Sequence, residues 1–190
     1  MNRSKLTMAN PEVLVTTDPI THVNREDIQW LKTKAAENPR QRIRLCAHIS
    51  VDDAVHEMLI VHTKITYNQP HKHPNKSESY HLIEGELDIV IFDEAGEVLE
   101  TVRMGEYASD ARFYWRLSES HYHMVIPRSE VVVFHEITSG PFDRATSFVP
   151  APWSPEDEET ADQERFLARV EERLRLFKIS GEDNGQTNSK

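Results

Sequence analysis

Residues 42–138 read as a run of short strands, and no stretch among them has the period of a helix. The first strand alternates apolar Ile43 and Leu45 with polar Arg42 and Arg44, a two-residue period typical of a half-buried strand. Further strands are expected at Met58–Tyr67, Tyr80–Ile83, Leu87–Phe92, Val98–Met104, Phe113–Leu117, His121–Ile126 and Val131–Thr138. Because parallel strands need crossover helices, the pattern excludes a parallel α/β fold and predicts an antiparallel sandwich or barrel.

A helix is expected on each side of this core. The first runs from Asn24 to Glu37, and Asn24 is its expected cap. The second opens at Ser154, with Pro155 at its first helical position. The chain of 190 residues therefore divides into an N-terminal arm at 1–22, a barrel with its preceding helix at 23–150, a C-terminal helix at 151–179 and a disordered tail at 180–190.

The charge balance limits the classes of partner. A formal net charge of −10 argues against nucleic acid or an anionic membrane surface, because both select for clustered lysine and arginine. The single cysteine, Cys46, cannot form an intramolecular disulfide, and no segment is apolar enough for a signal peptide or a membrane span. We therefore expect a soluble, cytoplasmic protein that binds a small molecule.

The stretch from His71 to Gly85 carries a pattern of metal ligands. Two histidines, His71 and His73, stand two positions apart, and Glu78 follows after four intervening residues. Residues two apart in an extended strand point to the same side, and a short turn after His73 can bring Glu78 back beside them. Two imidazoles and a carboxylate suit a divalent transition metal such as Fe, Mn, Zn or Ni. The alternative is a polar strand–turn–strand with surface histidines.

This pattern resembles the first motif of the cupin superfamily, whose members are small jelly-roll β-barrels that hold a metal through two histidines, a glutamate and a later histidine. The closer resemblance is to the WbuC-type cupin metalloproteins. It is carried by Arg42-x-Arg44-x-Cys46-x-His48, Pro70-His71-x-His73, Phe92-Asp93-Glu94-x-Gly96, His123 with its following apolar strand, Gly140-Pro141-Phe142 and Ala151-Pro152-Trp153-x-Pro155-Glu156. The resemblance implies an all-β core formed by a single antiparallel cupin jelly-roll barrel, with one helix before it and one after it.

The resemblance also implies a fourth ligand near a later proline. His121 and His123 are two residues apart, so both are expected to point to the same face of their strand. His123 aligns with the histidine that binds metal in the family, which leaves His121 as an acid–base candidate. Tyr80 shares a face with Glu78, so its phenol is either a second acid–base candidate or an ordinary core aromatic.

Four further side chains are candidates for binding substrate. Arg42, Arg44 and His48 lie on one face of their strand, where the two arginines would clamp a carboxylate or phosphate if that face looks into the barrel. If the face looks outward, they are solvated charges. Arg116 presents the same two alternatives on its own strand.

These observations favour a metal-dependent enzyme that acts on a small polar or anionic molecule, and the resemblance to WbuC-type proteins implies a sugar-like one. The alternatives are an Fe(II)-dependent dioxygenase of a small organic acid, a metal-free cupin of the deoxysugar epimerase or isomerase kind, and a non-catalytic module that binds metal or metabolite. Because cupin barrels commonly pair through an edge strand, we also expect a homodimer.

Overall fold

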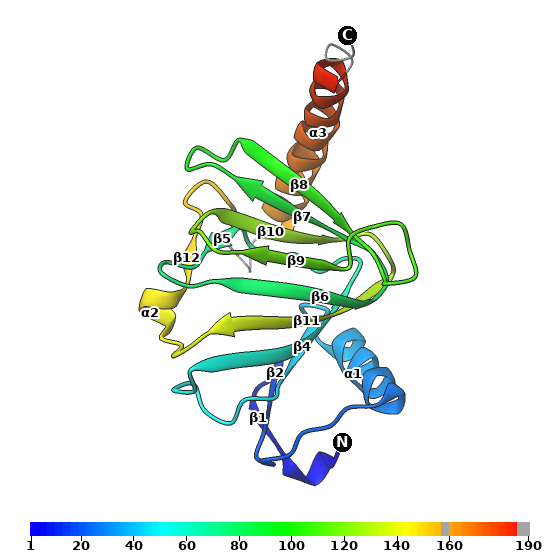
Figure 1. The fold of residues 1–190 in the computed structure, drawn as a ribbon, viewed down its shortest axis with the longest axis vertical. Helices are drawn as coiled ribbons and strands as arrows, with labels where there is room; N and C mark the ends of the chain where they lie inside the picture. The colour runs from blue at the N-terminus through cyan, green and yellow to red at the C-terminus, as the bar shows by residue number, and fades with distance from the viewer. Residues whose placement is uncertain (157–159, 186–190) are drawn as a thin grey trace.

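The computed structural model describes residues 1–156 and 160–185, and within them the chain forms two β-sheets that face each other (Figure 1). The seven-stranded sheet contains, in spatial order, β1 (Leu6–Asn10), β2 (Val13–Thr16), β3 (Arg42–Cys46), β4 (Val55–Thr63), β11 (Val131–Ser139), β6 (Glu78–Glu84) and β9 (Tyr114–Leu117). The five-stranded sheet contains β12 (Val149–Pro150), β5 (His71–Lys72), β10 (Tyr122–Pro127), β7 (Leu87–Phe92) and β8 (Val98–Met104). The helical elements are η1 (Arg3–Lys5), α1 (Arg25–Glu37), α2 (Arg144–Ser147) and α3 (Thr160–Gly185).

The strand order is that of a jelly roll. From β4 to β11 the strands form nested antiparallel pairs, β4 with β11, β5 with β10, β6 with β9 and β7 with β8. Successive pairs lie in opposite sheets, as they do when one long hairpin is rolled up into a barrel. The predicted fold class, an all-β antiparallel jelly-roll barrel with a helix on each side, is confirmed by this strand order.

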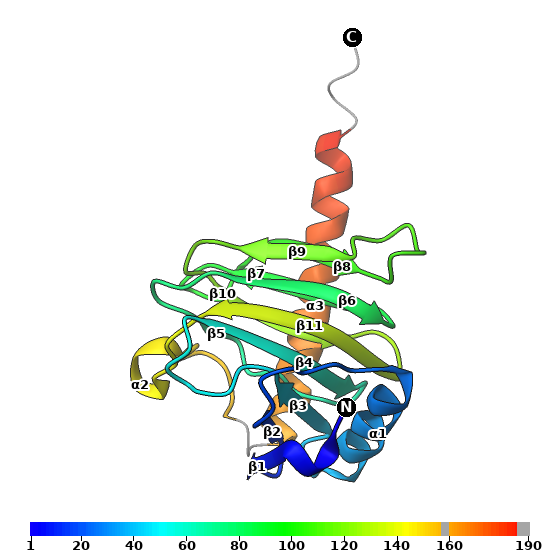
Figure 2. The same ribbon diagram turned by 60° about the horizontal axis from the view of Figure 1, so that its bottom comes forward.

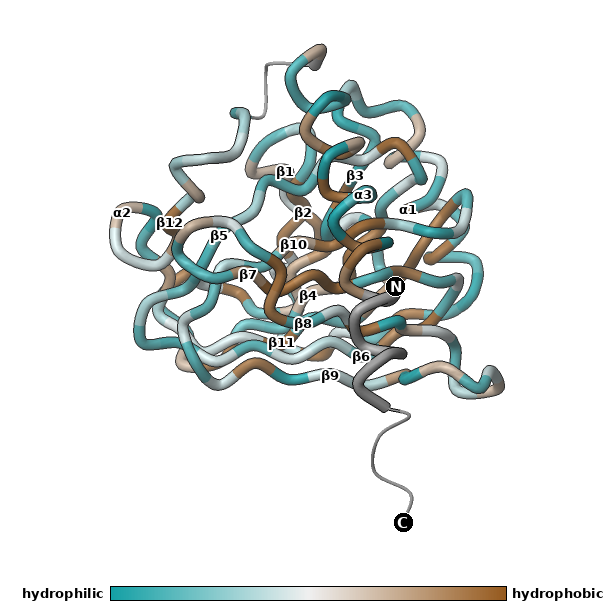
Figure 3. Tube along the Cα trace, turned by 90° about the horizontal axis from the view of Figure 1, so that it is seen from above, coloured by the Kyte–Doolittle hydropathy of each residue, from teal (hydrophilic) through white to brown (hydrophobic). Residues whose placement is uncertain are grey.

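The apolar core fills the space between the sheets, and the two long helices cover their outer faces. Inside the barrel, Leu82, Leu87, Ile89, Val125 and Phe134 are buried together. Both β7 and β10 are buried at every position, and they are coloured as hydrophobic strands in Figure 3. These strands tolerate apolar residues on both faces because α3 covers the outer face of the five-stranded sheet.

Helix α1 covers the seven-stranded sheet at the end near the N-terminus (Figure 2). It begins as expected: the Asn24 side chain accepts a hydrogen bond from the Asp27 amide at 3.1 Å, and the Asp27 carboxylate accepts one from the Asn24 amide at 3.0 Å. Its inner residues pack on Ile43 and Leu45 of β3, which are buried. Since side chains alternate along a strand, Arg42, Arg44 and Cys46 belong to the opposite face of β3 and turn toward the barrel interior.

Two glycines permit tight turns between strands. Gly85, which closes the ligand-rich stretch, has φ of 85°, and a Cβ there would stand 2.5 Å from the carbonyl oxygen of Val131. Gly96, at the expected hairpin turn between β7 and β8, also has φ of 85° and lies against the Trp153 ring. Only glycine fits a left-handed backbone with this little room.

The chain ends differ from the expected arm and tail. Residues within 1–22 form the hairpin of β1 and β2, and β2 pairs in parallel with β3, so the arm extends the sheet. The two strands are too short for their alternation to be read in the sequence. Ser154 lies in the loop before the second helix, and residues 180–185 continue α3 and are not a disordered tail. The rest of the predicted tail, 186–190, and residues 157–159 of the predicted helix lie outside the described residues. No helix in the described chain has the length and apolarity that a membrane span needs.

Candidate metal centre

Three histidines from two adjacent strands meet at one end of the barrel. His71 is in β5, His73 follows it in the turn, and His123 in β10 is the direct cross-strand partner of His71. One ring nitrogen from each imidazole lies within 4.8 Å of the other two. His123 and His71 are buried, and the side chain of His73 is 15% exposed. The structure therefore brings together the three imidazoles that were predicted from the sequence as metal ligands.

Backbone carbonyls fix the tautomer of all three rings. The Nδ1 atoms of His71, His73 and His123 donate to the carbonyl oxygens of Gln69 at 2.7 Å, Ser147 at 2.5 Å and His121 at 3.0 Å. A carbonyl can only accept, so each Nδ1 carries a proton and each Nε2 is the nitrogen left to bind a metal ion or a further proton. This is the arrangement in which histidine binds a metal, with the second nitrogen held by a hydrogen bond.

The fourth group is Glu78 in β6, a buried carboxylate. Its Oε1 lies 2.6 Å from His123 Nε2, and its Oε2 lies 3.7 Å from His73 Nε2. Neither Glu78 Oε1 nor His123 Nε2 has a hydrogen-bond partner among the described residues. Two lone pairs in such contact repel each other unless a positive charge lies between them, either a proton or a metal ion.

The electrostatics of the centre follow from this crowding. Burial, followed by the neighbouring charges of His123 and His73, holds the pKa of His71 well below its ordinary value, so His71 is neutral. Burial also disfavours charge on His123, but the Glu78 carboxylate outweighs it and raises the pKa of His123. Burial likewise opposes ionisation of Glu78, yet the same pairing lowers the pKa of Glu78. Without metal, a proton therefore bridges Glu78 and His123.

Tyr80 reaches the same carboxylate. Its hydroxyl donates to Glu78 Oε2 at 3.0 Å, and its ring packs against Trp115 and Phe134. Burial and the Glu78 charge raise the pKa of Tyr80 well above its ordinary value, so the phenol keeps its proton. Of the two alternatives for Tyr80, the structure shows the core aromatic, whose hydroxyl orients the Glu78 carboxylate, and the acid–base role stays a prediction from the sequence.

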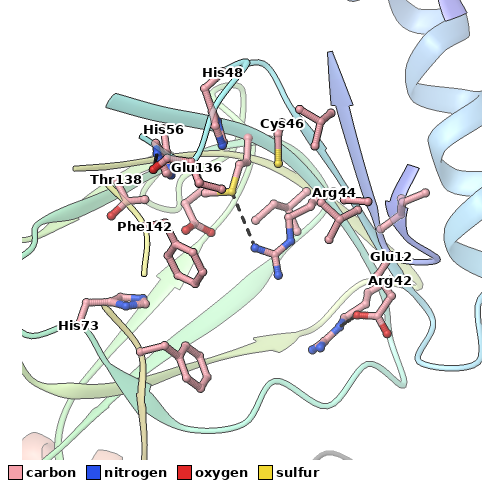
Figure 4. Close-up of a pocket in the computed structure, with 18 of the residues that line it drawn as sticks. Glu12, Arg42, Arg44, Cys46, His48, His56, His73, Glu136, Thr138 and Phe142 are labelled. Carbon is pink, nitrogen blue, oxygen red and sulfur yellow. Dashed lines mark hydrogen bonds and ion pairs between the residues drawn. The ribbon is translucent and has the colours of Figure 1, made fainter. Parts of the chain in front are cut away.

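The centre opens onto a cavity of ≈ 550 Å³ that runs through the barrel interior to β3 and β4 (Figure 4). Three of the four sequence-predicted substrate residues, Arg42, Arg44 and His48, line it. Arg42 is bound to Glu12, with its Nε 2.9 Å from Oε2, so the predicted arginine pair does not act as one clamp. Arg44 has no carboxylate within ion-pair distance among residues 1–156 and 160–185, and its guanidinium points into the cavity in Figure 4.

Two predicted candidates lie outside this cavity. Strand β10 begins at Tyr122, so His121 lies in the segment before it, where its Nε2 is 3.3 Å from Glu119 Oε2. The contact of His121 with the metal centre is made by its carbonyl oxygen, which accepts a hydrogen bond from His123 Nδ1. Arg116 lies on the outer face of β9 and donates to Ser77 Oγ at 2.9 Å. The acid–base role expected of His121 and the substrate role expected of Arg116 therefore have no geometric support.

Two features of the site were not predicted from the sequence. The first is Glu136 in β11, which lines the cavity on the same strand face as Phe134. An acidic residue at an inward position of a predicted apolar strand could have indicated it as a site residue. The second feature is the segment 143–150. Its Ser147 carbonyl orients His73, and its Phe148 ring stacks on His71 with centroids 4.5 Å apart. Nothing in the sequence links this segment to histidines more than 70 positions away.

Comparisons with known proteins give one family match and several structural likenesses. A family model described as a domain of unknown function (DUF6016) matches residues 23–104, which include His71, His73 and Glu78 but end before His123. A search of curated proteins finds no match.

Among solved structures, protein SO0799 of Shewanella oneidensis is 12% identical over 56% of this chain and 72% of its own, with a TM-score of 0.48. The cupin domain of Schizosaccharomyces pombe Cnp3 is 10% identical over 52% of this chain and 64% of its own, with a TM-score of 0.41. Bacillus subtilis oxalate decarboxylase, a protein with Mn(II) centres, is 19% identical over 52% of this chain and 24% of its own, with a TM-score of 0.39. The chain thus spans about a quarter of that enzyme, and the jelly-roll assignment rests on the strand order itself.

Proposed function

We propose that this protein is a metal-dependent enzyme that binds one divalent transition-metal ion through His71, His73, His123 and Glu78 and acts on a small anionic metabolite in the adjoining cavity. The contact between Glu78 Oε1 and His123 Nε2 carries this proposal. Both atoms are buried and lack a hydrogen-bond partner in the described chain, and they lie 2.6 Å apart. A metal ion satisfies both lone pairs together with the two remaining imidazoles.

The residues around the ligands support a catalytic role over a purely structural one. Four protein ligands would leave further positions open on an ion that prefers five or six, and two of the ligands, His71 and His73, line the cavity. A bound divalent ion supplies Lewis-acid polarisation of a substrate oxygen or, if it is Fe(II), redox chemistry. Tyr80 holds the Glu78 carboxylate in place, and Arg44 faces the same cavity as a cation that can anchor an anionic substrate.

A metal-free isomerase of the epimerase kind is the weaker alternative. Such an enzyme needs a histidine or tyrosine poised to exchange a proton with substrate. Here all three imidazoles are held by backbone carbonyls with Nε2 directed at one point, and the Tyr80 hydroxyl is bound to Glu78. Membership of the WbuC-type group and a cytoplasmic location remain predictions from the sequence.

The experiment compares wild-type protein with His123→Ala, both incubated with pooled small organic acids and sugar acids and followed by mass spectrometry. The enzyme proposal predicts that wild type, loaded in turn with Fe(II), Mn(II) and Zn(II), converts at least one compound and that His123→Ala does not. A wild-type protein that holds its metal and converts nothing favours the binding-module alternative. Equal turnover by His123→Ala and wild type contradicts metal dependence.

A further inference from the structure

Apolar groups form the larger share of the cavity wall. Met58, Ile60 and Phe134 line it from the inner face of the seven-stranded sheet, and Phe142 and Phe148 line it near His73 (Figure 4). Phe148 is fixed in place, because it stacks on His71 and the Arg144 guanidinium lies 4.1 Å above its ring. Surfaces of this kind favour an apolar ligand body, since each square ångström removed from water contributes about 25 cal/mol.

Most polar side chains along the cavity are already bound to the protein. The following lining residues each form a hydrogen bond within the chain: His48 with Glu57, His56 with Val51, Asn68 with Val125, Lys76 with Ser139, Tyr80 with Glu78 and Thr138 with Ser77. Arg40 and Arg42 both bind Glu12. A ligand rich in hydroxyl groups would therefore bury several of them without partners, at a cost of about 1–3 kcal/mol each.

Two lining side chains are exceptions. One is His62, whose buried Nδ1 has no hydrogen-bond partner in the described chain. The other is Arg44. Its one hydrogen-bonding contact in the described chain is to Met58 Sδ at 3.9 Å, and a thioether is a weak acceptor that leaves a guanidinium largely unsatisfied. The residue belongs to β3, while the candidate metal ligands lie on β5 and the turn after it, on β6 and on β10, so the cation and the metal centre come from different strands around one cavity. At ≈ 550 Å³ the cavity is much larger than a two-carbon acid such as oxalate requires.

We infer that the substrate is an organic acid with an extended apolar body, held by its carboxylate at Arg44 and presenting an oxygen at its other end to the metal centre. Only the part of this inference that places a substrate oxygen at the metal centre rests on the proposed function. It differs from the sugar-like substrate implied by the sequence resemblance, because Arg44 stands beside apolar side chains where a sugar needs a ring of hydrogen-bonding groups.

The test uses a matched pair of probes, adipate and galactarate. Both are six-carbon dicarboxylates with the same charge, and galactarate differs by four hydroxyl groups. Binding to metal-loaded, desalted protein is measured by isothermal titration calorimetry for wild type, Arg44→Gln and the control Arg116→Gln, whose arginine lies on the outer face of β9. Arg144→Gln tests whether the arginine at the rim is the anchor instead.

The inference predicts that adipate binds wild type at least about tenfold more tightly than galactarate, and that Arg44→Gln weakens adipate binding about tenfold or more because a charge-assisted hydrogen bond is lost. Arg116→Gln should bind adipate as wild type does. Galactarate binding as tightly as adipate, no adipate binding, or a loss confined to Arg144→Gln overturns it. Metal content of the same samples separates the two proposals: Arg44-dependent adipate binding in protein that takes up no metal supports the ligand site and contradicts the metal enzyme.

Discussion

Replacing Glu136 by glutamine should change how the stability of the metal-free protein depends on pH. Burial, followed by the negative charge of Glu78, raises the pKa of Glu136 from its ordinary value of 4.5 to about 7, and Arg44 offsets only part of this. The folded protein therefore holds a proton on Glu136 that the unfolded chain releases near pH 4.5. The stability from this proton is fully present below pH 4.5 and is lost as pH rises through about 7.

The magnitude follows from the two pKa values. The difference between 4.5 and about 7 corresponds to about 3 kcal/mol at ~1.4 kcal/mol per pKa unit. Glu136 lines a cavity that admits water, so solvent screening should reduce the effect to about 1–2 kcal/mol. Glutamine has the same shape and no charge to lose, so Glu136→Gln should gain about this much stability over wild type between pH 5 and pH 8.

The assay is urea denaturation of chelator-treated protein at pH 5 and at pH 8, with wild type and Glu136→Gln measured together. Glu130→Gln is the control, because that carboxylate is 84% exposed and its replacement should shift stability equally at both pH values. An unchanged difference between Glu136→Gln and wild type across this range would refute the placement of the Glu136 carboxyl in a desolvated wall near Glu78.

Other predictions concern the metal centre and assembly. His123→Ala should weaken metal affinity by more than 100-fold in competitive titration, and His121→Ala should change it little. A larger loss for His121→Ala than for His123→Ala would make His121 the ligand instead. Below the raised pKa of His123, metal binding should release a proton, because the ion replaces the proton shared by Glu78 and His123, and metal affinity should fall up to about tenfold per pH unit. Calorimetry in two buffers of different ionisation enthalpy measures the release, and no release at any pH would contradict the bridging proton. Phe148→Ala should lower metal affinity without unfolding the barrel, as checked by circular dichroism, since the ring stacks on His71. Light scattering should give the mass of two chains, and a single-chain mass at all concentrations would rule out the homodimer.

The site was predictable wherever the direction of a side chain follows from the alternation of side chains along a strand. His71 with His73, and Glu78 with Tyr80, were expected to project together, and the structure brings all four to one end of the barrel. The same argument placed Arg44 on the face of β3 opposite the apolar residues, but only the position of α1 decides that this face looks inward.

The sequence alone does not show where a strand begins, which backbone carbonyls reach a side chain, or which distant strands pair. His121 has the parity of His123, yet β10 begins one residue after it, and the limit of a strand is set by the pairing of its neighbour β7. The carbonyl of Ser147 orients His73 from 74 positions away, and any residue type presents a carbonyl. The pairing of β2 with β3 is likewise a long-range contact that neither segment signals by itself.

The most direct test of the central claim is elemental analysis of protein purified without a metal-affinity tag or chelator, combined with thermal unfolding before and after the metal is removed. The account predicts about one divalent transition-metal ion per chain. At a hundredfold excess of metal over its Kd, binding contributes about 2.7 kcal/mol, which raises Tm by about 5–10 °C for a chain of this size. Protein that emerges without metal, and whose Tm does not respond to Fe(II), Mn(II), Ni(II) or Zn(II), would contradict it.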